Sequence, residues 1–65
     1  MISNVPDGYV AIAYDWIGAS TDSAKLFIIE EKNYWIPNSQ IYEIFEDDER
    51  QVIISRWIAE KKQLI

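Results

Sequence analysis

The fold class is decided by the stretch Gln51-Val52-Ile53-Ile54-Ser55-Arg56-Trp57-Ile58-Ala59-Glu60-Lys61, in which the spacing of apolar residues changes partway. Residues 51–54 are typical of a short strand. From position 54 apolar side chains and a lysine stem recur at i, i+3, i+4, i+7 and i+11, which is one face of a helix. Ser55 is placed to cap the N-terminus of that helix. The stretch therefore predicts a strand followed directly by a helix over residues 55–65.

Residues 9–17 alternate in polarity. Their odd positions are mostly small or polar, and their even positions are large and apolar. The even-numbered side chains are Val10, Ile12, Tyr14 and Trp16. A period of two predicts one strand that packs one face against a core. Residues 1–8 precede it as a lead-in that ends in the turn-forming Pro6-Asp7-Gly8.

Further β segments are expected between these two regions. Small and polar residues predict a loop at 18–23 and a hairpin turn at 31–33. The β segments fall at 25–30, apolar enough to be buried on both faces, at 34–36 and at 39–45. The prediction is an α+β domain: a small curved antiparallel sheet of four or five strands over residues 9–54, with one C-terminal helix packed on it.

A length of 65 residues corresponds to a single domain. A domain this short buries only about 60% of the surface of its unfolded chain. Three Trp, four Tyr and two Phe supply bulk for its core. The absence of cysteine fits a cytoplasmic protein. No segment reads as a signal peptide or approaches the roughly 20 apolar residues of a membrane span, so we expect a soluble protein without membrane contacts.

The formal net charge of −5 is unevenly distributed, since residues 1–49 are strongly acidic and residues 50–65 are basic. Phosphate binding depends on clustered Lys and Arg, so we expect no direct binding to nucleic acid. A protein with a basic surface is a more compatible partner for this acidic chain than nucleic acid is. A charge of this size also keeps a small domain soluble, which is the simpler explanation.

Groups for catalysis are scarce in this chain. Histidine and cysteine are both absent, which removes the most common general base, nucleophile and metal ligands. Gly8 and Gly18 lie too far apart for a phosphate-binding loop. A carboxylate pair such as Asp15 and Glu30 could do acid–base chemistry, but a domain of this size has little room for a pocket around it. We therefore expect a non-enzyme without catalytic residues, metal or cofactor.

The acidic run at 46–49 is the first candidate for a binding site. Four adjacent carboxylates repel one another, so they belong on a solvated loop. A charged hairpin turn that protects a sheet edge is the simpler explanation for them, and a patch for a basic groove is the functional one. The acids proposed to bind a partner are Glu43, Glu46, Asp47, Asp48 and Glu49, together with Asp15, Glu30 and Glu31.

Aromatic residues are the second candidate feature. Most of them must form the core, yet they are more than one small core easily hides, and Tyr and Trp are enriched at interface hot spots. We expect two or three to be exposed, with Tyr34 and Tyr42 the first candidates. We expect Trp57 to be buried, in which case Trp57→Ala costs about 3–5 kcal/mol.

Two segments resemble a pattern shared by a group of very small phage and mobile-element proteins. The first is Trp35-Ile36-Pro37-Asn38-Ser39-Gln40-Ile41, which is similar to W-[IL]-P-x-S-Q-I, and the second is the stretch 57–64, which is similar to W-[LI]-A-x-K-x-x-L. The resemblance covers roughly residues 25–65. It implies that Trp35 and Trp57 pack the sheet on the helix and that Ser39-Gln40 shapes a bend.

Two positions depart from that pattern. Asn38 stands where the similar proteins often have a basic residue, and Ser55 stands where a proline commonly opens their helix. The motif residues look structural, so the resemblance implies origin and fold more directly than activity.

The resemblance also implies a function through that origin. Small, acidic phage proteins without catalytic residues include inhibitors of host defence, among them anti-CRISPR proteins that look like DNA to the effector complex. By this likeness the expected function is a phage-encoded acidic inhibitor of a host nucleic-acid-targeting defence complex, acting on the basic DNA-binding subunit. Such a protein would be cytoplasmic in the bacterial host, as a monomer or a weak homodimer.

Two alternatives stay open at this point. One is a phage accessory module that binds a replication or recombination protein. The other is a small structural homodimer that uses Trp57, Leu64 and Ile65.

Overall fold

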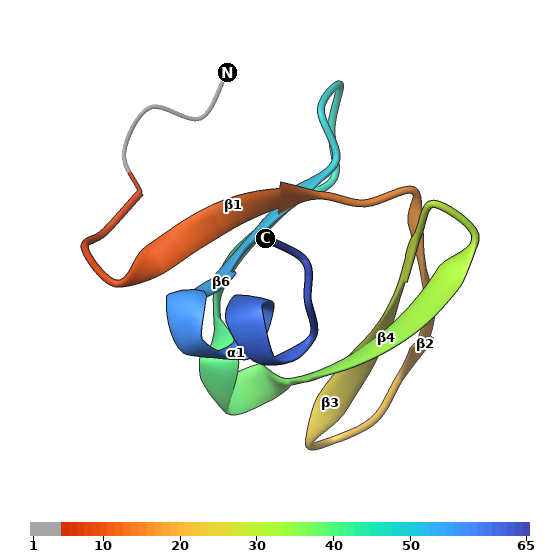
Figure 1. The fold of residues 1–65 in the computed structure, drawn as a ribbon. Helices are drawn as coiled ribbons and strands as arrows, with labels where there is room; N and C mark the ends of the chain where they lie inside the picture. Colours follow the sequence, from red (N-terminus) through yellow and green to blue (C-terminus); the bar gives the residue numbers. More distant parts are fainter. Residues whose placement is uncertain (1–4) are drawn as a thin grey trace.

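The computed structural model describes residues 5–65, which form short strands and one short helix. The elements in chain order are β1 Tyr9–Ala13, β2 Trp16–Ser20, β3 Ala24–Ile29, β4 Lys32–Pro37, a 3₁₀ turn at Asn38–Gln40, β5 Ile41–Phe45, β6 Gln51–Ser55 and α1 Arg56–Lys61. The strands pair into two antiparallel sheets of three strands each, a first sheet in the order β1-β6-β5 and a second in the order β2-β3-β4 (Figure 1). Part of the expected lead-in, residues 1–4, lies outside the described residues.

The prediction of antiparallel strands with one C-terminal helix is confirmed, whereas a single sheet of four or five strands is not what forms. The reason lies at Tyr14 and Asp15, which interrupt the strand expected over residues 9–17. The N–H of Tyr14 donates to the carbonyl of Arg50, next to the first sheet (3.1 Å), and the N–H of Asp15 donates to the carbonyl of Ile28 in the second (2.8 Å). The chain therefore passes at this corner from one sheet into the other.

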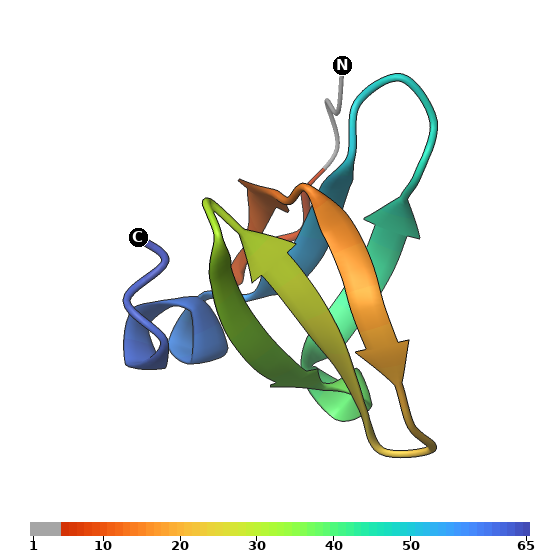
Figure 2. The ribbon, with the colours of Figure 1, turned by 90° about the vertical axis from the view of Figure 1, so that its right-hand side faces the viewer.

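A second corner joins β4 to β5. Strand was expected from position 39, but the 3₁₀ turn follows Pro37 and β5 begins only at Ile41. The side-chain amide of Asn38 donates to the carbonyl of Asp22 (3.1 Å), which ties this corner to the β2–β3 loop. Figure 2 shows the second sheet in front of the first, so that the two sheets face each other.

The space between the sheets is the hydrophobic core. Its buried members are Ile12, Tyr14, Phe27, Ile29, Ile36, Val52, Ile54, Ile58 and Ala59. The rings of Tyr14 and Phe27 meet edge to face, with 5.1 Å between their centroids, which adds to the stabilisation from their buried area. Only one face of β3 enters this core, so the prediction of burial on both faces is wrong. Leu26 and Ile28 alternate with the inward residues and lie half-buried on the outer face.

The bend at Asp15 also changes which side chains point inward. Before the bend the even positions face the core, as predicted: Val10 is half-buried, Ile12 and Tyr14 are buried, and Tyr14 is the last of them. After the bend Ile17 packs against the core, and Trp16 is 57% exposed although alternation predicted it to be buried. At the Asp15 corner the inward-facing positions change from even to odd residue numbers.

The end of β2 lies in the segment that was expected to be a loop, residues 18–23. A Cβ at Gly18 would lie 3.4 Å from the side chain of Ile28 and 3.5 Å from that of Leu26. The side chains of Ile28 and Leu26 therefore pack directly over the backbone of Gly18, which has no side chain of its own. The register against β3 shifts at this point, which is the signature of a bulge.

The helix α1 is shorter than the expected 55–65. Ser55 is its N-cap as predicted, because its hydroxyl oxygen accepts from the N–H of Ile58 (3.2 Å). The helix ends early where Gln63 takes a φ of 60° and the N–H of Leu64 returns to a helix carbonyl (2.8 Å). This places Leu64 against the core. Among residues 5–65, no helix is long and apolar enough to cross a membrane.

Trp57 is exposed, which corrects the prediction that it is buried. The helix turns Ile58 and Ala59 toward β1 and β6, and this leaves Trp57 on the solvent side with 58% exposure. The ammonium of Lys61 lies 5.0 Å from the centre of its ring. Trp35 is also exposed, at 44%, so neither tryptophan packs the sheet on the helix as the resemblance implied.

Candidate binding site at the acidic end

The turn between β3 and β4 lies against the corner between β1 and β2. The link between them is a hydrogen bond in which the Glu30 N–H donates to a carboxylate oxygen of Asp15 (3.0 Å). Two acidic residues that are fifteen positions apart in the sequence are thereby held together at the surface. Both side chains are exposed, so the contact brings negative charge to one place instead of burying it.

The β3–β4 turn itself has an unusual backbone. Ile29 pairs with Lys32, so only two residues form the loop, and these are Glu30 with φ 51° and Glu31 with φ 69°. A two-residue hairpin loop with positive φ at both positions is a type I′ turn, for which Asn-Gly is the favoured sequence. A left-handed conformation costs a residue with a Cβ about 1–2 kcal/mol. The expected turn at 31–33 is thus displaced by one residue and occupied by two glutamates that strain it.

Tyr14 connects this corner to the loop between β5 and β6. Its hydroxyl donates to the carbonyl of Phe45 (3.1 Å), and the guanidinium of Arg50 donates to the carbonyl of Asp15. Burial raises the pKa of the Tyr14 hydroxyl, the nearby carboxylate of Glu46 raises it further, and Arg50 opposes both. Residues at both ends of the acidic loop are therefore in electrostatic reach of the same corner.

We call this region the acidic end. It comprises the corner residue Asp15, the turn residues Glu30 and Glu31, and the loop residues Glu46, Asp47, Asp48 and Glu49. In Figures 1 and 2 the β1–β2 corner, the β3–β4 turn and the β5–β6 loop all lie at the same end of the molecule. Arg50 and Lys32 are the cations at this end, and they leave it strongly negative.

The other predicted site residues lie elsewhere. Glu43 and Tyr42 are exposed on β5, and the ring of Tyr42 lies 5.4 Å from that of Tyr9. Tyr42 is 57% exposed, which confirms the prediction for that residue. Tyr34 is not exposed as predicted; it is half-buried and packs against the core, because it faces inward from β4 opposite Phe27.

Sequence reasoning missed three residues of this region. Tyr14 and Arg50 hold the acidic end together, and Trp16 presents an exposed ring directly after Asp15. Arg50 could have been noticed as the cation that ends the acidic run. The exposure of Trp16 had no signal in the sequence, because it follows from the bend.

The described residues contain no group of three or more Asp, Glu, His or Cys side chains arranged to hold a metal ion. The carboxylates of the acidic end can attract cationic groups and accept hydrogen bonds from them. Comparison with known proteins finds no match, either to a family model, to a curated protein or to a solved structure.

Proposed function

We propose that this chain is a non-catalytic binding protein whose acidic end docks on the basic, nucleic-acid-binding surface of another protein. The carboxylates of the acidic end would occupy the positions that phosphates of a bound nucleic acid take. Charge complementarity of this kind speeds association and makes it sensitive to salt. The chain would act as a competitor of nucleic acid without binding nucleic acid itself.

The observation that carries this proposal is the strained pair Glu30 and Glu31. A turn selected for stability alone would favour Asn and Gly at these positions, which would remove both the strain and the like-charge repulsion. Residues that break a local rule without a structural gain are characteristic of functional positions. Here the turn that breaks the rule lies against Asp15, to whose carboxylate the Glu30 N–H donates, and it lies at the same end as the acidic loop.

Trp16 supplies an apolar element next to these charges. Its ring is 57% exposed on the outer face of the second sheet, near the half-buried Ile28 with which it pairs. Interfaces commonly combine a tryptophan anchor with a charged rim. A partner that engages the acidic end can therefore gain apolar contact at Trp16.

The resemblance of residues 25–65 to small phage and mobile-element proteins makes a DNA-targeting defence complex of the host the first partner to test. Under this proposal the protein is an anti-CRISPR-like inhibitor that occupies the target-recognition groove. A phage replication or recombination protein with a basic surface is the second partner class. Both partners would bind the same acidic end. They differ in which protein–nucleic-acid complex the chain would dissociate, that of the defence effector or that of the phage protein.

The test is competition for a labelled DNA duplex between this protein and candidate effector complexes. The acidic-end variant carries Asp47→Lys and Asp48→Lys, and we expect it to need at least about tenfold more protein for the same displacement. The matched control carries Asp7→Lys and Asp22→Lys, which changes the net charge equally at exposed positions outside the acidic end. Equal loss in the two double variants would show that net charge alone matters. Full activity of the acidic-end variant, with its fold intact, would refute the proposal.

A further inference from the structure

Each sheet has two edge strands, and β1 differs from the other three. β2 and β5 both carry a register shift, which disrupts their pairing edge. β4 carries Lys32 and ends in Pro37, and charges and prolines are common devices against edge pairing. β1, with the sequence YVAIA, pairs regularly with β6 over all five residues and contains no charge, no proline and no bulge.

The hydrogen-bond pattern shows which backbone groups β1 leaves open. Tyr14 donates to the carbonyl of Arg50, and Arg56 donates to the carbonyl of Gly8, so the even positions of this segment bond toward β6. Antiparallel pairing alternates between bonded and non-bonded positions. The N–H and C=O groups of Ala11 and Ala13 therefore point away from β6, to the free edge. Both residues are exposed.

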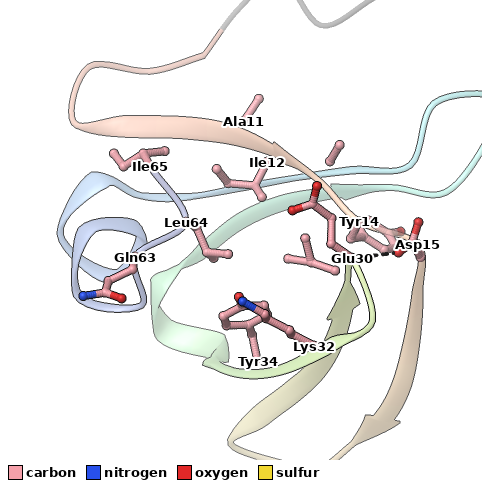
Figure 3. Close-up of a pocket in the computed structure, with 12 residues that line it drawn as sticks. Ala11, Ile12, Tyr14, Asp15, Glu30, Lys32, Tyr34, Gln63, Leu64 and Ile65 are labelled. Atoms are coloured by element: carbon pink, nitrogen blue, oxygen red, sulfur yellow. Dashed lines mark hydrogen bonds between the residues drawn. The ribbon is translucent and has the colours of Figure 1, made fainter.

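A groove runs along this edge. Its volume is about 580 Å³, and β1 forms one wall. Figure 3 shows Ala11 and Ile12 on one side of the groove and Tyr34 and Lys32 on the other. The C-terminal residues 63–65 lie at one end of it, and Asp15 and Glu30 lie at the other.

We propose that the free edge of β1 binds an extended segment of a partner protein, which adds to the first sheet as a fourth strand. The outward groups of Ala11 and Ala13 would supply main-chain hydrogen bonds, as in other cases of β-strand addition. Their methyl side chains leave room for the incoming backbone. A Lys or Arg of the segment would meet the carboxylates of Asp15 and Glu30 at the end of the groove.

Charge favours such a segment over a second copy of this chain. A second β1 strand, YVAIA, carries no cation that could meet Asp15 and Glu30, and Asp7 just before it is negative. Like charges directly opposite each other destabilise strand pairing. A segment with basic residues at its end meets the same carboxylates with the opposite sign.

The test uses a synthetic heptapeptide, capped at both ends, in which Val and Thr alternate between terminal lysines. Titration into the ¹⁵N-labelled protein should shift the amide signals of Ala11 and Ala13 and slow their hydrogen exchange. A matched peptide with terminal glutamates should bind at least about tenfold more weakly, because its charges repel Asp15 and Glu30. Peptides N-methylated at odd or at even positions provide the backbone control. Only alternate N–H groups of the peptide can point toward β1, so methylation of one of the two sets must abolish binding.

Two protein variants complete the test. Ala13→Pro removes an outward N–H without removing a bond to β6, and it should weaken binding of the lysine peptide at least about tenfold. Asp15→Asn with Glu30→Gln should abolish the preference for the lysine peptide while leaving the edge intact, and this variant keeps the test decisive if Ala13→Pro fails to fold. Shifts confined to residues outside the groove, or no shift at millimolar peptide, would overturn the proposal. Self-association that Ala13→Pro abolishes would overturn the choice of occupant. Because the peptide replaces any natural partner, this result does not depend on the proposed function.

Discussion

The packed space between the two sheets and the acidic end follow opposite rules. Between the sheets, aliphatic and aromatic side chains are buried and none has a left-handed backbone conformation, and changes in their volume cost stability. At the acidic end, carboxylates crowd together around a turn whose backbone is strained. The comparison teaches that one region stabilises the fold, whereas the other gives up stability through its strained turn and its crowded like charges. Such an exchange is common where a surface has a function.

The largest expected effect breaks the packed region. Phe27→Ala removes a ring with no exposed surface and should cost about 3–5 kcal/mol, which is comparable to the whole stability of so small a domain. Trp57→Ala removes a larger but exposed ring and should cost no more than about 1 kcal/mol, mainly its contact with Lys61. Urea denaturation of both variants measures the difference. Similar losses in the two would mean that Trp57 belongs to the core after all.

An intermediate effect of the opposite sign is expected at the acidic end. Replacing the turn with Glu30→Asn and Glu31→Gly removes two strained residues and two like charges, so it should raise the free energy of unfolding by about 1–2 kcal/mol. The same variant should compete less well with DNA for the partner. Thermal unfolding measures the stability of the variant, and the competition assay on the same protein preparation measures its displacement of DNA. A turn variant that gains no stability would contradict the strain on which the comparison rests.

The smallest expected effect lies at the border of the two regions, at Tyr14. Tyr14→Phe loses the hydrogen bond to the Phe45 carbonyl and should cost about 1 kcal/mol at neutral pH. In the folded protein the pKa of Tyr14 is raised above its value of 10.0 in the unfolded chain. Above about pH 10 the unfolded state therefore binds fewer protons than the folded one, and the parent loses stability as the pH rises.

The pH dependence of the Tyr14→Phe variant separates the loss of the hydrogen bond to Phe45 from the effect of the raised pKa of Tyr14. Without the Tyr14 hydroxyl, the decline in stability above about pH 10 should be shallower than in the parent. Denaturant titrations at pH 7, 9, 10 and 11 measure it. Parallel curves for the two proteins would show that burial and Glu46 do not hold the Tyr14 proton.

The sequence by itself determined best which residues of the first strand face the core and where the C-terminal helix begins. Alternation predicts that Ile12 and Tyr14 are buried, the period change at Ile54 predicts the helix, and Ser55 fits its N-cap, all of which the structure bears out. These signals are local, because they depend on the fixed side-chain periods of strands and helices and on the chemistry of one hydroxyl. The acidic run on the β5–β6 loop was visible for the same reason.

The tertiary structure alone decided where the corners fall and what they bring together. The bend at Tyr14 and Asp15 exists because consecutive N–H groups find carbonyls in two different sheets, and no pattern within residues 9–17 contains those partners. That bend exposes Trp16 and places Asp15 beside Glu30, whereas the choice of helix face exposes Trp57. Exposure and proximity depend on contacts between residues far apart in the chain. They are therefore decided by how the sheets pack, and not by the spacing of residues along any one strand.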